Sequence, residues 1–343
     1  MYKSIKQFVD YLKDQGQLTV VSEFTDTASG IAERTCAEES EPDGGKALLF
    51  TDTGTAYPVL TNVFSSKRRM EMVLGVESYE DIAERAECTL SEVFALGQKM
   101  RGYIEAVSLA RKFSCWTPVQ TKLHPSCQDS IQNIAHLGLL PFISDSGKEG
   151  LKVLSPVALN SRNPKNGART LEPNKLYILD ECTAGIAIPP HSEIARHLEL
   201  CTHRLPLAAC LGGDPLHTFI AAAPKIGGID PYLLTGFFRG KPVSLTRAFT
   251  QDIEIPAGSD LVIEGYIQKS EGLSPDGLMK LHVTCITHRR GAIIPMMTGS
   301  GTASEKETVR QAVEKIFIEP LRRTVSRTNE ALLLSEEVFY GSH

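Results

Sequence analysis

The stretch that decides the fold is residues 261–290, LVIEGYIQKSEGLSPDGLMKLHVTCITHRR. An apolar run at 261–263 and an alternating segment at 281–287 predict two strands. The segment between them is broken by glycine, serine and proline and carries two acids, Glu271 and Asp276. Glycines let a backbone pass close to a ligand, and acids on such a loop can exchange protons with it. The segment is therefore either an ordinary hairpin turn or part of an active site.

Length and composition limit the class of protein. The chain has 343 residues, 42% of them hydrophobic, and a net charge of -5, which is enough for two domains and a sizeable core. Mild acidity without a basic cluster argues against a nucleic-acid partner. There is no transmembrane run, and the charged N-terminus is unlike a signal peptide, so no membrane partner is expected. The eight cysteines form no CxxC pair, which favours free thiols, no zinc site and a cytoplasmic location.

The beginning of the chain predicts a small α/β domain, residues 1–113. Apolar residues at helical spacing predict a helix over 5–12 that ends at Gly16. Short apolar runs predict strands at 47–50 and 58–64, and the pattern over 78–113 is helical.

Short strands dominate from residue 129 onward, with a helix over 191–200 capped by Ser192. A last helical segment, 304–334, contains Pro320, which should kink it. The chain is therefore expected to be α+β, with a second domain over 114–302 and a helical tail over 303–343. The apolar face of the tail should pack on the barrel or on a second subunit, and it comprises Val309, Val313, Ile316 and Phe317.

Several longer motifs occur in a specific order. They are ALLF at 47–50, PVLTNVF at 58–64, ACLGGDP at 209–215, AAAPKIGGIDPYLLTGFFRGKPV at 221–243, IPAGSDLVIEGYI at 255–267, EGLSPDG at 271–277 and VTCITHRRGAIIPMMTG at 283–299. Together they give the chain a resemblance to the UbiD family, decarboxylases that use prenylated flavin mononucleotide (prenylated FMN). The resemblance implies that the second domain is a split β-barrel of the flavin-reductase-like type. It also implies a large third domain that encloses the cofactor and builds a dimer, whereas this chain continues only with the predicted tail.

The resemblance also implies site residues. The family chemistry needs an arginine and two acids around the substrate, and an Asn, a His and a Glu that hold a divalent metal against the flavin phosphate. Glu271 and Asp276 stand at the positions of the two acids. His191 matches the metal-binding histidine, and Pro231 stands where the metal-binding glutamate is expected.

Two alignments of residues 161–176, SRNPKNGARTLEPNKL, are open for the remaining two positions. The preferred one places Thr170 at the asparagine position and Lys175 at the arginine position, which also leaves His191 at a family-like distance. A different gap placement puts Asn166 and Arg169 there instead.

These departures weaken the predicted cation site. Proline offers no side-chain ligand, and threonine is a poor substitute for an amide oxygen on a hard cation. Lysine keeps a positive charge but loses the bidentate grip of arginine on a carboxylate. The family pattern thus implies prenylated FMN with a divalent metal, whereas the departures at Thr170 and Pro231 favour its absence.

Three functions are compatible with the sequence. The first is a UbiD-type lyase that removes CO2 from an unsaturated or aromatic carboxylic acid, with an acid of the 271–276 loop returning the proton. The second is an enzyme on the same fold that works without the flavin, through Lys175, His191, Glu271 and Asp276. The third is a non-catalytic partner of a full-length relative. The expected partners are a small carboxylic acid and a second copy of the chain. In the enzymes, repulsion between the two acids should raise at least one carboxyl pKa.

Overall fold

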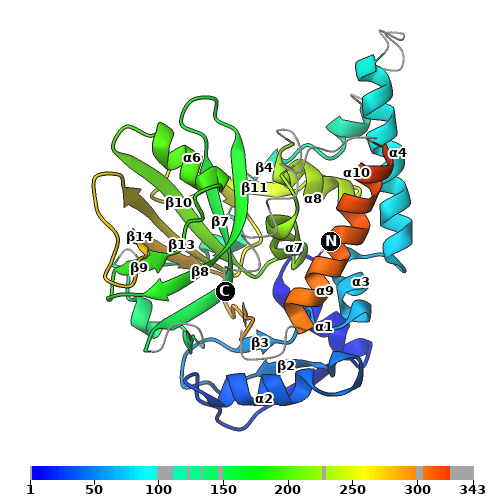
Figure 1. Ribbon diagram of the computed structural model, residues 1–343. Coiled ribbons are helices and arrows are strands. Elements are labelled where there is room, and N and C mark those ends of the chain that lie inside the picture. Colours follow the sequence, from blue (N-terminus) through cyan, green and yellow to red (C-terminus); the bar gives the residue numbers. More distant parts are fainter. Residues whose placement is uncertain are drawn as a thin grey trace.

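The computed structural model describes residues 2–98, 111–121, 124–132, 134–145, 150–225, 229–298 and 304–324. A β-barrel lies on one side of the molecule, a layer of helices lies on the other, and a small sheet with α2 lies below both (Figure 1). The mixed α+β fold expected from the sequence is confirmed. None of the described helices is long and apolar enough to cross a lipid bilayer.

The N-terminal elements follow the apolar pattern of their sequence. Helix α1 (Ile5–Asp14) starts at Ser4, whose side chain accepts the N–H of Gln7 at 3.3 Å, and it buries its predicted apolar face. A four-stranded sheet follows in the order β1 (Leu18–Val21), β2 (Ala47–Phe50), β3 (Val59–Thr61) and β15 (Ile294–Pro295). Helices α2 (Gly30–Glu39), α3 (Lys67–Leu74) and α4 (Tyr79–Gln98) and the short turn η1 (Pro42–Gly44) accompany it.

Six antiparallel strands close into the barrel, which confirms the split-barrel expectation. They are β7 (Lys152–Arg162), β8 (Arg169–Ile178), β9 (Thr183–Ile186), β10 (Arg204–Leu211), β13 (Leu261–Gln268) and β14 (Met279–His288). Their order is β10-β13-β14-β9-β8-β7, and pairing of β10 with β7 completes the ring. Short strands β5 (Ser130–Gln132) and β6 (Ile143–Ser144) pair with β14 and β7. Helix α6 (Glu193–Leu200) begins at Ser192, as predicted, since its hydroxyl accepts the N–H of Ala195 at 3.0 Å.

The two strands of the deciding stretch form a hairpin within this barrel. Leu261 pairs with His288 and Ile267 with Leu281, and the register shifts between Glu264 and Gly265. A Cβ at Gly265 would lie 2.3 Å from the carbonyl oxygen of His282, so only glycine fits at this point. The apolar alternation of the sequence therefore fills the barrel interior, and the bulge lets the strands bend around it.

The helical layer lies between the barrel and the long helix α4 (Figure 1). It contains α7 (Leu216–Ala222), α8 (Pro231–Arg239), α9 (Ser304–Val313), the π-helical turn η4 (Glu314–Ile318) and α10 (Glu319–Thr324). A second small sheet is ordered β12 (Glu254–Pro256), β11 (Ser244–Arg247) and β4 (Val119–Gln120). The one-turn helices η2 (Ser126–Gln128) and η3 (Leu137–Leu139) complete the described elements.

The tail packs within its own chain. The ring of Phe317 lies 5.9 Å from that of Phe219 in α7 and 5.7 Å from that of Phe238 in α8. Val309 and Ile316 are buried in the same core, so the apolar face meets helices of this chain. The wide turn η4 directly precedes Pro320, which has no N–H to continue the ordinary helical ladder. The predicted continuation of this helix beyond residue 324 lies outside the described residues.

The division into residues 1–113, 114–302 and 303–343 stays a prediction, and residues 99–110, just before its first boundary, are not described. One contact bears on how the parts are joined. Strand β15, which follows the barrel in sequence, pairs in parallel with β3 of the N-terminal sheet, with Ile294 opposite Val59. The eight cysteines are free thiols, as the sequence predicts.

Candidate functional site

The two acids of the EGLSPDG loop lie in the turn between β13 and β14. Gly277 adopts φ 74°, and the N–H of Gly277 donates to the carbonyl of Ser274 at 2.9 Å. The carboxylate of Glu271 lies 2.5 Å from Nε2 of His282 and 3.3 Å from Nζ of Lys280. The hydrogen bond with His282 is the main reason that the pKa of Glu271 is lowered. The structure thus places Glu271 between an imidazole and an ammonium near the surface, and Asp276 lies exposed five residues further along the turn.

Lys175 lies on β8 beside a buried carboxylate that the sequence analysis did not identify. Its Nζ is 3.0 Å from Oδ1 of Asp145, and the hydroxyl of Tyr177 donates to Oδ2 of the same residue at 3.1 Å. The side chain of Asp145 is only 3% exposed. Burial and then the charge of Asp145 raise the pKa of Tyr177 above its usual value. The carboxylate of Asp145 therefore holds the ammonium of Lys175 and the phenol of Tyr177 in place.

The tail helix adds a second ammonium to this group. Burial lowers the pKa of Lys306 in α9, and the charge of Lys175 lowers it further, whereas Asp145 acts in the opposite direction. Lys306 makes no hydrogen bond or ion pair within the described part of the chain. Lys306 therefore lies close enough for the charges of Lys175 and Asp145 to act on it, whereas Lys175 alone is ion-paired with Asp145.

Strand register places Lys175 and the acid loop at the same end of the barrel. Gly185 of β9 pairs with Tyr177 on one side and with Lys280 on the other. Side chains directly opposite each other point to the same face of a sheet, so Lys175, Tyr177 and Lys280 share one face. The backbones of β8 and β14 are two strand spacings apart there, about 10 Å. Lys175 and Glu271 are thus neighbours across β9, although no contact joins them.

The alternative pair, Asn166 and Arg169, is engaged in structural contacts. Arg169 forms ion pairs with Asp230, at 2.5 Å, and with Glu254. The side chain of Asn166 accepts the N–H of Ala168 at 2.9 Å in an exposed turn. Arg169 is already paired with two carboxylates, so it is a poor candidate for holding a substrate carboxylate.

The side chains at the predicted metal positions do not fit a divalent ion. Thr170 is buried on β8, Pro231 is the first residue of α8, and His191 is exposed just before α6. Proline contributes no ligand, and a hydroxyl with an imidazole makes an incomplete set for a hard cation. Among the residues that the structure describes, no group of three His, Cys, Asp or Glu is arranged to hold a metal.

A lysine and a buried glutamate lie at the junction of β8 with the segment between α7 and α8, without a hydrogen bond or ion pair between them among the described residues. The Nζ of Lys225 donates to the carbonyls of Leu171 and, at 3.2 Å, of Ala221. Glu172, which is buried, accepts the N–H of Glu193 at 2.8 Å. Residue 225 is exposed overall, yet enclosure of its ammonium lowers the pKa of Lys225, against the opposing charge of Glu172. Burial raises the pKa of Glu172.

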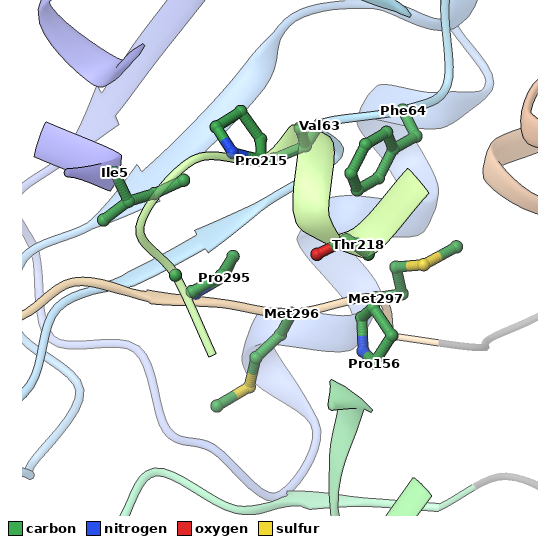
Figure 2. Close-up of a pocket in the computed structure, with 10 residues that line it drawn as sticks. Ile5, Val63, Phe64, Pro156, Pro215, Thr218, Pro295, Met296 and Met297 are labelled. Carbon is green, nitrogen blue, oxygen red and sulfur yellow. The ribbon is translucent and has the colours of Figure 1, made fainter. Parts of the chain in front are cut away.

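An apolar pocket lies where α1, α7 and the segment after the barrel meet (Figure 2). Its only polar side chain is that of Thr218, and none of the predicted site residues lines it. It therefore has no group for acid–base chemistry. The lining residues are Ile5, Val63, Phe64, Pro156, Gly212, Pro215, Thr218, Pro295, Met296 and Met297.

Comparison with known proteins identifies the family to which this barrel belongs. The sequence model described as the 3-octaprenyl-4-hydroxybenzoate carboxy-lyase Rift-related domain matches residues 119–302, more than half of the chain. The chain belongs to the UbiD family. The N-terminal domain model of the same carboxy-lyase matches residues 9–88 of this UbiD protein.

Relatives and solved structures agree with that assignment. Proteins of Aquifex aeolicus and Archaeoglobus fulgidus are each 26% identical, over 99% and 94% of this chain and 73% and 69% of their own length. The vanillic acid decarboxylase of Sedimentibacter hydroxybenzoicus in closed form superposes with a TM-score of 0.79, 21% identity, and coverage of 95% of this chain and 70% of that one. HmfF of Pelotomaculum thermopropionicum, in complex with prFMN, superposes with a TM-score of 0.74 and 21% identity. The match covers 94% of this chain and 73% of that one. At this identity the superpositions show the fold.

Proposed function

We propose that this UbiD protein is a carboxy-lyase that removes CO2 from an unsaturated or aromatic carboxylic acid. The observation that carries the proposal is the ammonium of Lys175, fixed by Asp145 at 3.0 Å on the face that it shares with the acid loop. A decarboxylase needs a cation that orients the substrate carboxylate and a group nearby that handles the proton. Membership of a carboxy-lyase family supports the same reaction class.

Lys175 is proposed to bind the substrate carboxylate. Its ammonium is a point charge without the fork of arginine, so the carboxylate would be held by charge more than by geometry. Asp145 and Tyr177 act as positioning residues, because they fix the ammonium from the buried side. Lys306 adds positive charge at the same end of β8 and so offsets the charge of Asp145.

Proton transfer is proposed for the loop that carries Glu271 and Asp276. The hydrogen bond with His282 lowers the pKa of Glu271 and so favours its ionised form, so a proton that Glu271 delivers to the product carbon must first be taken up from water. At Glu271 this corrects the expectation from sequence that repulsion between the two acids would raise a carboxyl pKa. Asp276, on the exposed side of the turn, is retained as the second candidate.

The family cofactor, prenylated FMN, would supply the electron sink of the decarboxylation when it is bound. The side chains at 170 and 231 do not provide the metal site that accompanies it in the family pattern. This mismatch favours, as a second candidate, an enzyme on the same fold that works without the flavin. A homodimer is proposed for either enzyme, and the third possibility is a non-catalytic partner of a full-length relative.

The test is CO2 release from a panel of cinnamic-, benzoic- and furoic-type acids. The protein is produced with and without a prenylflavin synthase, and the full chain is used in both cases. We expect turnover of at least one acid and a raised KM in Lys175→Ala, with the exposed Lys165→Ala as control. Turnover only in the flavin-loaded sample supports the lyase, and equal turnover in both supports the flavin-free enzyme. No turnover in either sample, together with a changed rate of a full-length relative on mixing, would assign the partner role.

A further inference from the structure

The mismatch between the family's cation site and this chain can be followed to particular atoms. Strand β8 meets the segment between α7 and α8 at Thr170, and the residues on either side of Thr170 are tied to that segment. Arg169 pairs with Asp230 at 2.5 Å, and the carbonyl of Leu171 accepts a hydrogen bond from Lys225. Position 170 is therefore next in sequence to the residue whose carbonyl holds the ammonium of Lys225, and position 231 directly follows the partner of Arg169.

The surroundings of this ammonium resemble those of a bound cation. Carbonyl oxygens are typical ligands of hard cations in proteins, and Lys225 Nζ is held by the carbonyls of Leu171 and Ala221. An ammonium has three N–H donors, and the structure gives Lys225 no further hydrogen bond within its described residues. Its third donor is therefore not used by any described residue.

The nearest acid does not compete for that donor. The carboxylate of Glu172 is taken up at the start of α6, where it accepts the N–H of Glu193 at 2.8 Å. The carboxylate is therefore directed toward α6 and makes no hydrogen bond with the ammonium of Lys225 in the described part of the chain.

We propose that the ammonium of Lys225 replaces the divalent metal of the family site and binds the phosphate of a flavin mononucleotide directly. Lysine is a common phosphate ligand that acts as a point charge, and a built-in cation makes binding independent of added metal. This inference rests on the proposed function only in that it takes the flavin as the ligand. Leu171 and Lys175 lie four residues apart on β8, about 13 Å, so phosphate and substrate carboxylate have separate cations.

The test is binding of FMN to the full chain, monitored through the quenching of flavin fluorescence. It is carried out in two buffers, one with EDTA and one with Mn²⁺. We expect equal dissociation constants in the two buffers. Lys225→Met should weaken FMN binding roughly tenfold or more, which corresponds to about 1.4 kcal/mol. The same variant should leave binding of riboflavin, which has no phosphate, unchanged, and Lys165→Met should behave as wild type. Lys225→Arg keeps the charge and should retain most of the affinity for FMN. It provides a second test of the charge if Lys225→Met does not fold.

Three results would overturn the inference. The first is stoichiometric Mn²⁺ binding to the wild-type protein by electron paramagnetic resonance, or FMN binding that needs Mn²⁺. The second is equal loss of FMN and riboflavin binding in Lys225→Met, or none. The third is an absence of FMN binding by the wild-type protein. CO2 release from the acid panel is measured separately, so each of these results leaves the proposed lyase activity to its own test.

Discussion

The carboxylate of Glu305 in α9 accepts a hydrogen bond of 2.9 Å from the backbone N–H of Phe64, 241 residues earlier in the chain. This contact joins the tail helix to the segment that follows β3. Burial and then the charge of Glu39 raise the pKa of Glu305 to about 8, whereas the N–H of Phe64 and the charge of Arg69 act in the opposite direction. The tail is therefore docked through a carboxyl group that is protonated at neutral pH.

The first prediction is that the contribution of Glu305 to stability falls as pH rises toward 8. The pKa of Glu305 is about 8 in the folded chain, against an ordinary value of 4.5, so the folded state binds more protons between these values. The contribution of Glu305 is therefore fully present below the unfolded pKa and is lost as pH rises through the folded one, on the order of 1 kcal/mol per pH unit. Glu305→Gln should flatten this slope in urea unfolding between pH 5.5 and pH 8.5, values chosen to lie within and just above that interval.

Glu307→Gln is a matched control for Glu305 on the same helix. Hydrogen bonds from Arg310 and Gln311 lower the pKa of Glu307 to about 2, so its contribution is lost only in acid. The control should keep the wild-type slope over the pH interval of the test. Equal slopes in all three proteins would contradict the placement of Glu305.

The second prediction concerns Lys175. Lys175→Ala removes the proposed carboxylate ligand and should raise KM roughly tenfold or more, since a lost charged contact is worth about 1.5–3 kcal/mol. It should change kcat less than KM. Asp145→Asn keeps the size of the positioning residue and should alter KM in the same assay without abolishing turnover. An unchanged KM in Lys175→Ala would move the carboxylate site away from β8.

The third prediction concerns the acid loop. Glu271→Gln and Asp276→Asn should leave the melting temperature unchanged, because both residues lie at the surface of a turn. The variant of the residue that handles the proton should lower kcat by roughly 10²-fold, the usual scale for general acid–base catalysis. We expect the larger effect at Glu271, and His282→Ala should reproduce it. Wild-type kcat in both acid variants would return the loop to the role of an ordinary turn.

The fourth prediction separates a structural arginine from a catalytic one. Arg169→Ala leaves Asp230 and Glu254 without their shared cation and should lower the free energy of unfolding by about 2 kcal/mol, the scale of a charged hydrogen bond in a partly buried site. The exposed pair of Arg247 with Asp252 serves as control, since solvent screens its charges and Arg247→Ala should change the free energy of unfolding less than Arg169→Ala does. An unfolding free energy equal to that of the wild type, with a raised KM, would favour the alternative alignment.

The sequence was informative wherever contacts are local. The helix over 5–12, the strand at 47–50 and the cap at Ser192 depend on neighbouring residues, and the structure confirms them. The polar contacts at the site are different, because they depend on strand register and join segments far apart in sequence. Asp145 reaches Lys175 across 30 residues and Lys225 reaches Leu171 across 54, and no periodic pattern signals such pairs. The one feature of the sequence that pointed to Lys225 is its position inside the motif APKIGG, residues 223–228.

The pairing of β15 with β3 has a consequence for how the chain is made. The N-terminal sheet gains its fourth strand only when Ile294 and Pro295 have been synthesised, after the whole barrel. Parallel strands far apart in sequence form slowly, because the intervening loop must first be closed. During translation the edge of β3 is therefore unpaired while the barrel folds. Strand β15, which is made after the barrel strands, then pairs with β3 and connects the barrel to the N-terminal sheet. A fragment that ends at residue 113 leaves this edge open to other chains, so it should aggregate where the full chain does not.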